Sequence, residues 1–192
     1  MSRRIVLVGL VVLTLATSGC RGQAQPEPGP VSSPTVAPVA GPVAFHVQLG
    51  AGQTMTIRSP KPGGCPGFDA MINLGSDRNV ELMAFGTSCV AAAGDNAQPG
   101  NGRHGVYRTT MDIPADRLSA AVAVHTVLGE ATVFNQPYYE CTNSCKNYTE
   151  PVAIVMLAHP SDPEYQTLMA VAVKGSIGLD QLSAFLRDQV LA

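Results

Sequence analysis

Two β-rich runs in the middle of the chain constrain the fold most strongly. Residues 68–74 and 80–86 flank a polar turn at 75–79, and their apolar side chains recur at every second position. A period of two places alternate residues on the same face of a strand. If the turn is centred on Asp77, Ile72 faces Leu82, and every cross-strand pair on that face is apolar or glycine. The pattern predicts an antiparallel hairpin with one face in the core.

The rest of the chain after residue 42 also has mainly strand composition. Pro114–Leu118 is short enough for one helical turn, and Leu179–Leu191 has an apolar stripe with helical spacing. We therefore predict an α+β fold, a mainly antiparallel sheet of roughly six to eight strands packed by a C-terminal helix. The other strand-like runs are 43–49, 53–58, 106–112, 121–127, 131–140, 152–158 and 167–174.

Four cysteines in this region predict two disulfides. The same hairpin register places Cys65 opposite Cys89, which predicts a cross-strand bond worth roughly 3–4 kcal/mol in the chain-entropy model. Cys141 and Cys145 are left as the second pair, across a turn of Thr, Asn and Ser. A turn fixed in this way could serve as a recognition surface.

The N-terminal residues form an export signal. Arg3 and Arg4 precede an apolar run, Ile5–Ala16, which is too short for a permanent membrane span, and small residues lead to Cys20. This pattern resembles the lipobox of bacterial lipoproteins. The resemblance implies that residues 1–19 are a signal peptide and that Cys20 carries a diacylglyceryl group with fatty acids such as palmitate. The paired arginines leave the twin-arginine export route open beside the general one.

The segment after Cys20 is rich in proline, with six of the 15 prolines in residues 21–42. Such a composition cannot bury a core, so we expect residues 20–42 to be the lipidated cysteine and a disordered tether, and residues 43–192 to be one globular domain. Nine arginines against three lysines, with much Ala, Val, Gly and Pro, resemble actinobacterial lipoproteins in style. We expect the domain to lie outside the cell, at the outer face of the membrane.

The sequence contains no recognisable catalytic motif. It has no nucleophile elbow, no phosphate-binding glycine loop and no zinc spacing, so no catalytic residue, metal ligand or cofactor is predicted. Of the four histidines, His104 lies in a Gly-rich loop and is expected to be the most exposed. Without Arg3 and Arg4 the net charge falls to about −4, which excludes an electrostatic surface for nucleic acid.

One face of the predicted hairpin carries Met71, Met83 and Phe85, with the two methionines in contact. Methionine-rich faces suit adaptable apolar binding. This face is therefore a candidate binding surface, unless the C-terminal helix covers it as ordinary core.

Three functions remain open. The first is a lipid-anchored, non-catalytic binding domain for a protein or cell-wall partner. The second is a carrier that holds a small apolar ligand between sheet and helix. The third is an exported thiol-redox or copper protein that uses Cys141 and Cys145, since thiolates bind Cu(I).

Overall fold

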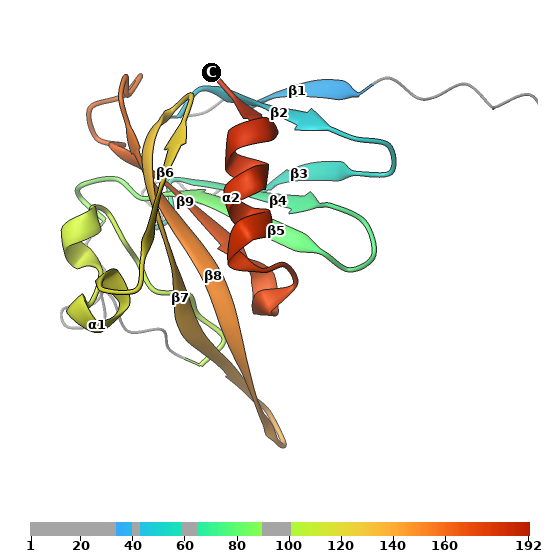
Figure 1. Cartoon of the computed structure of the whole chain (residues 1–192), viewed down its shortest axis with the longest axis vertical. Coiled ribbons are helices and arrows are strands. Elements are labelled where there is room, and N and C mark those ends of the chain that lie inside the picture. The colour runs from blue at the N-terminus through green and yellow to red at the C-terminus, as the bar shows by residue number, and fades with distance from the viewer. Residues whose placement is uncertain (1–33, 40–42, 59–64, 90–100) are drawn as a thin grey trace, which may run out of the picture. The chain divides into compact units, whose positions relative to one another are not determined.

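The computed structural model describes residues 34–39, 43–58, 65–89 and 101–192 of the chain (Figure 1). These residues contain ten strands and two α-helices. The strands are β1 (Thr35–Val39), β2 (Phe45–Leu49), β3 (Thr54–Arg58), β4 (Phe68–Asn73), β5 (Asn79–Ala84), β6 (Val122–Thr126), β7 (Gly129–Cys141), β8 (Cys145–Leu157), β9 (Thr167–Ala172) and β10 (Val190–Leu191). The helices are α1 (Ala115–Leu118) and α2 (Leu179–Asp188), with 3-10 turns η1 (Thr110–Asp112) and η2 (Val173–Gly175). None of the helices in these ranges is long and apolar enough to cross a membrane.

Seven strands form one antiparallel sheet in the order β3-β4-β5-β9-β8-β7-β6. Every side chain of β9 is buried, because this strand lies in the middle of the sheet and both faces of the sheet are covered. The predicted class, an antiparallel sheet with a C-terminal helix and two disulfides, is confirmed.

Helix α2 covers one face of the large sheet, together with the small sheet β1-β2-β10 (Figure 1). Leu182, Phe185 and Leu186 form the buried stripe of the helix. The helix ends earlier than predicted, at Asp188, because Val190 pairs with Val47 of β2 and continues as strand β10.

The segment from residue 101 to residue 121 covers the opposite face of the sheet. Tyr107 and Ile113 are buried there against Met83, Phe134 and other side chains of the sheet. The strand predicted over Val106–Asp112 is wrong. The Asp112 carboxylate accepts backbone N–H groups of Arg108 and Thr109, which folds the chain into the turn η1.

The end of the predicted tether is part of the fold. Thr35–Val39 forms strand β1 and pairs with β2 on its outer side, so the folded region begins before residue 43. Pro38 is tolerated because β1 is an edge strand. Residues 1–33, which include the predicted signal peptide and Cys20, lie outside the described residues.

The register of the β4–β5 hairpin differs from the predicted one by two residues. Ile72 faces Val80 rather than Leu82, and Met71 faces Glu81 rather than Met83. The turn is centred on Ser76 rather than on Asp77, and both of these residues adopt left-handed backbone conformations. A shift of two keeps the alternation, so the core face of the hairpin is as predicted.

Both predicted disulfides are present. Cys65 and Cys89 have a Cα–Cα distance of 5.7 Å and join the chain segments beyond the ends of β4 and β5, where the ladder no longer fixes the register. Cys141 and Cys145 face each other at the end of the β7–β8 hairpin, with a Cα–Cα distance of 4.1 Å.

Candidate functional site

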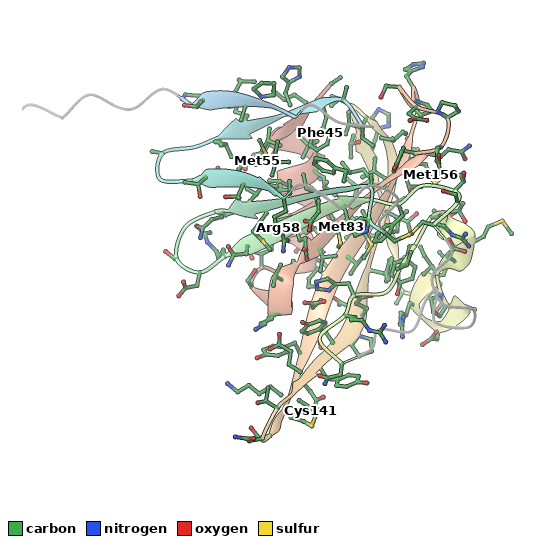
Figure 2. The ribbon with its side chains drawn as sticks, turned by 180° about the vertical axis from the view of Figure 1, so that it is seen from behind. Phe45, Met55, Arg58, Met83, Cys141 and Met156 are labelled. Atoms are coloured by element: carbon green, nitrogen blue, oxygen red, sulfur yellow. A yellow bond between two sulfur atoms is a disulfide. The ribbon has the colours of Figure 1, made fainter. Side chains whose placement is uncertain are left out.

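A group of charged side chains lies on the face of the sheet that the 101–121 segment covers, the same face as Met83. Arg58 comes from β3, Asp69 from β4, Glu81 from β5 and Glu150 from β8. His104 belongs to the covering segment and contacts two of these carboxylates, those of Glu81 and Glu150. Figure 2 shows the surrounding side chains, with Arg58 and Met83 labelled. We call these five residues the charged cluster.

His104 bridges two strands of the sheet through both ring nitrogens. Its Nε2 lies 2.9 Å from a carboxylate oxygen of Glu81, and its Nδ1 lies 2.9 Å from one of Glu150. Only the protonated ring has an N–H on both nitrogens, so this geometry matches the imidazolium form. The ring also stacks on Tyr138, with centroids 5.1 Å apart.

Glu150 is the most deeply buried charge of the cluster, with 0% of its side chain exposed. One of its oxygens accepts the backbone N–H of Lys174 at 2.6 Å, and the other accepts from His104 and, at 3.4 Å, from Gln136. Lys174 has a left-handed backbone conformation, so this bond holds the turn after β9. A buried carboxylate needs such donors to remain ionised.

A chain of hydrogen bonds extends the cluster on the Glu150 side. Gln136 accepts from the Tyr107 hydroxyl at 3.0 Å, and Arg117 donates to the same hydroxyl at 3.0 Å. Tyr107 and Arg117 both belong to the covering segment. The covering segment is therefore fastened to the sheet by polar bonds as well as by apolar packing.

Arg58 closes the cluster on the other side. Its guanidinium pairs with Glu81 and lies 3.0 Å from Asp69. Burial and the nearby charge of Glu81 raise the pKa of Asp69, although Arg58 acts in the opposite direction. Burial also disfavours the charge on Glu81, but hydrogen bonds and charges from His104 and Arg58 outweigh it and lower the pKa of Glu81.

The electrostatics of His104 are dominated by its two carboxylates. Burial disfavours the protonated ring, but the hydrogen bonds and charges of Glu150 and Glu81 outweigh burial and raise its pKa to about 9. Both ring nitrogens are engaged, so the ring offers no lone pair to a metal or to a substrate. Among the described residues no group of three His, Cys, Asp or Glu side chains is placed to hold a metal ion. The arrangement acts as a fastening for the covering segment.

The three residues of the predicted apolar face do not form one surface. Met83 and Phe85 are buried beneath the covering segment, whereas Met71 is partly exposed and does not belong to the apolar residues buried there. Helix α2 lies on the other face of the sheet. A ligand between helix α2 and the sheet would therefore not touch Met83 or Phe85.

The β7–β8 hairpin extends beyond the rest of the sheet. Each strand has 13 residues, but β6 pairs only with Gly129–Val133 and β9 only with Val152–Met156 (Figure 1). The end of the hairpin, residues 139–149, carries the Cys141–Cys145 disulfide (Figure 2). We call residues 139–149 the hairpin tip.

The hairpin tip is supported from both sides. The Asn101 side chain bonds both backbone groups of Cys141, and the Gly102 N–H donates to the Tyr139 carbonyl at 2.8 Å. On the other side the Lys174 ammonium lies 2.8 Å from Glu140 and 5.9 Å from the centre of the Tyr148 ring. The tip is thus exposed and held in one shape.

Sequence reasoning found the cysteines of the tip but not the charged cluster. It also placed His104 in an exposed loop, whereas only 16% of its side chain is exposed. Glu81 and Glu150 could have indicated the cluster, because Glu81 lies within an apolar strand run and Glu150 lies at the start of another. Buried carboxylates require partners, and His104 is a natural one.

Comparisons with protein-family models, with curated proteins and with solved structures find no match for this chain.

Proposed function

We propose that this protein is a lipid-anchored binding domain on the outer face of a bacterial membrane and that its hairpin tip contacts a protein partner. The observation that carries the proposal is the tip itself, a disulfide-closed ribbon that extends beyond its neighbouring strands. Disulfides are typical of exported proteins, which agrees with the export signal in the sequence.

The chemistry of the tip suits contact with a protein. Its exposed side chains include Tyr139, Thr142, Asn143 and Lys146, and Tyr148 is partly exposed. Tyr, Ser and Asn are enriched in the loops of antibodies that bind proteins, because tyrosine gives a large contact area at low entropic cost. A tip that is already fixed loses little further entropy when it binds.

The proposed anchor would keep the hairpin tip within reach of partners at the membrane. With β1 starting at Thr35, residues 21–34 remain between Cys20 and the fold. Fourteen residues reach about 40 Å when extended as polyproline helix. The domain would then search for partners near the lipid surface.

Thiol-redox or copper chemistry at Cys141 and Cys145 is the second candidate. Its support is the exposure of Cys145, which lets a reductant reach the bond. It requires free thiolates at both positions, whereas partner contact requires the closed turn.

A photo-reactive side chain at Asn143 tests the binding proposal in cells that produce the full-length protein. We expect a discrete cross-linked adduct with one protein from this position, and none from the matched position Ala51, an exposed turn residue between β2 and β3. The purified partner should then lose binding to Asn143→Arg but not to Ala51→Arg, measured by calorimetry. No adduct at Asn143, equal adducts at both positions, or an adduct only after reduction of the tip would refute the proposal.

A further inference from the structure

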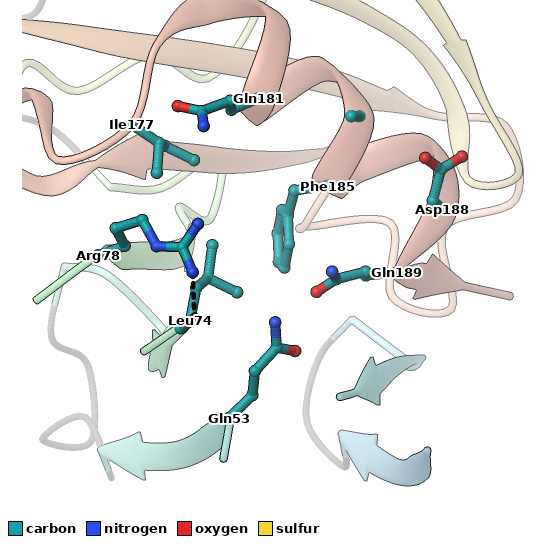
Figure 3. A pocket seen from close by; sticks show the side chains of 9 residues that line it. Gln53, Leu74, Arg78, Ile177, Gln181, Phe185, Asp188 and Gln189 are labelled. Carbon is teal, nitrogen blue, oxygen red and sulfur yellow. Dashed lines mark hydrogen bonds between the residues drawn. The ribbon is translucent and has the colours of Figure 1, made fainter. Parts of the chain in front are cut away.

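An open pocket of about 210 Å³ lies between helix α2 and the ends of strands β3 and β4 (Figure 3). The side chains of Leu74 and Phe185 form part of its apolar floor, and its rim carries Gln53, Gln181 and Gln189. None of its lining residues belongs to the hairpin tip or to the charged cluster, so this is a separate surface.

Gln189 brings an unpaired polar atom to this pocket. Its side-chain oxygen is buried and has no hydrogen-bond partner among the described residues. The backbone of Gln189 is fixed, because its N–H donates to Phe185 and its carbonyl accepts from Gln48. A buried acceptor without a partner costs about 1–3 kcal/mol, so a ligand hydroxyl that enters beside this amide would gain a hydrogen bond by donating to it.

The other two amides are oriented by bonds of their own. The side-chain oxygen of Gln53 accepts the Gly50 N–H at 2.8 Å, and that of Gln181 accepts the Gly178 N–H at 3.0 Å. Among the described residues neither NH₂ group has a hydrogen-bond acceptor, so both remain available to donate. Figure 3 shows the Gln53 and Gln189 amides turned toward each other across the opening.

The charges of the rim balance. Arg78 is held by bonds to the carbonyls of Gly75 and Leu74, at 3.1 and 3.0 Å, and Asp188 supplies one exposed carboxylate. A guanidinium and a carboxylate on one rim favour neither a polyanion nor a polycation. The site therefore suits a neutral ligand with many polar groups.

From these groups we infer that the pocket binds one neutral sugar residue of a glycan. A sugar hydroxyl both donates and accepts, so it can satisfy the Gln189 oxygen and the Gln53 NH₂ together. The apolar floor matches the C–H face of a pyranose ring. The volume is below the roughly 300 Å³ of pockets for drug-sized ligands, which suits a single ring, and the open side leaves room for the chain to continue.

Titration of the ¹⁵N-labelled full-length protein with chitotriose and, separately, with maltotriose tests this inference. We expect amide shifts that cluster at residues 53, 181 and 189 for at least one sugar, with a dissociation constant of about 1 mM, as an open single-ring site allows. Gln189→Leu and Gln53→Leu should each weaken binding by about tenfold or more, since each leaves a polar partner unsatisfied. Gln166→Leu, outside the pocket, should bind as the unmodified protein does.

Thermal melting of both pocket variants separates a loss of binding from a loss of folding, because Gln53→Leu also removes the acceptor of the Gly50 N–H. Absence of shifts at the pocket with both sugars at about 20 mM would overturn the inference. Binding to Gln53→Leu that is as tight as binding to the unmodified protein would also overturn it. So would binding of a sulfated glycan when neither neutral sugar binds.

Discussion

Replacement of Glu150 by alanine is expected to lower the free energy of unfolding by about 3–5 kcal/mol, the usual cost of breaking a buried ion pair. The substitution would leave the His104 imidazolium and the Lys174 N–H without their acceptor. Urea unfolding measures the change. Glu150→Gln keeps the shape and one acceptor, so its effect should lie between those of alanine and the unmodified protein.

The pair His125–Glu130 is a matched control for this prediction. It joins the same two residue types at 2.6 Å, but 84% and 68% of the two side chains are exposed. Exposed ion pairs contribute at most about 1 kcal/mol, so Glu130→Ala should change the stability by less than that. Equal effects at Glu150 and Glu130 would show that the charged cluster does not fasten the fold.

The stability of the protein is expected to fall as the pH rises from about 6.5 through about 9. The pKa of His104 is raised from 6.5 to about 9 in the folded protein. A raised pKa means that the folded state holds the proton more tightly, so the stabilisation is complete below pH 6.5 and is lost above 9. The full effect is about 3 kcal/mol.

Urea unfolding at several pH values measures this loss, with two variants for comparison. His104→Gln should be much less dependent on pH in this range, because it removes the titrating ring. His125→Gln should retain the pH dependence of the unmodified protein. A profile of His104→Gln that falls as steeply as the unmodified one would contradict the assignment.

How far the fold follows from the sequence is clearest in the β4–β5 hairpin. Alternation settles which side chains share a face, so Phe68, Ala70 and Ile72 were correctly assigned to the core. It does not settle the register, which depends on a turn with Ser76 and Asp77 in left-handed conformations. The Cys65–Cys89 bond was predicted correctly although the predicted register was wrong by two residues. Both cysteines lie beyond the paired residues, where the ladder does not fix which positions face each other.

Local composition misled the prediction at the two ends of the fold. Strands β1 and β10 are short and form only because β2 offers two free edges. The prolines around β1 favour a tether when they are considered alone. Tertiary pairing overrides such local preferences.

The buried carboxylates were visible in the sequence, but the way they meet at His104 was not. His104 and Glu150 are 46 residues apart, and Glu81 belongs to another strand. Only the strand order, with β9 between β5 and β8, brings the two carboxylates to opposite sides of one ring. That order depends on the whole chain.

The intact mass of the protein extracted from the membranes of cells that produce it tests the account most directly. Denatured without reduction, it should equal the chain from Cys20 onward plus a diacylglyceryl group, less the four hydrogens lost in two disulfides. A mass that retains residues 1–19, lacks the lipid, or keeps the four hydrogens would contradict the account of an exported, lipid-anchored binding domain.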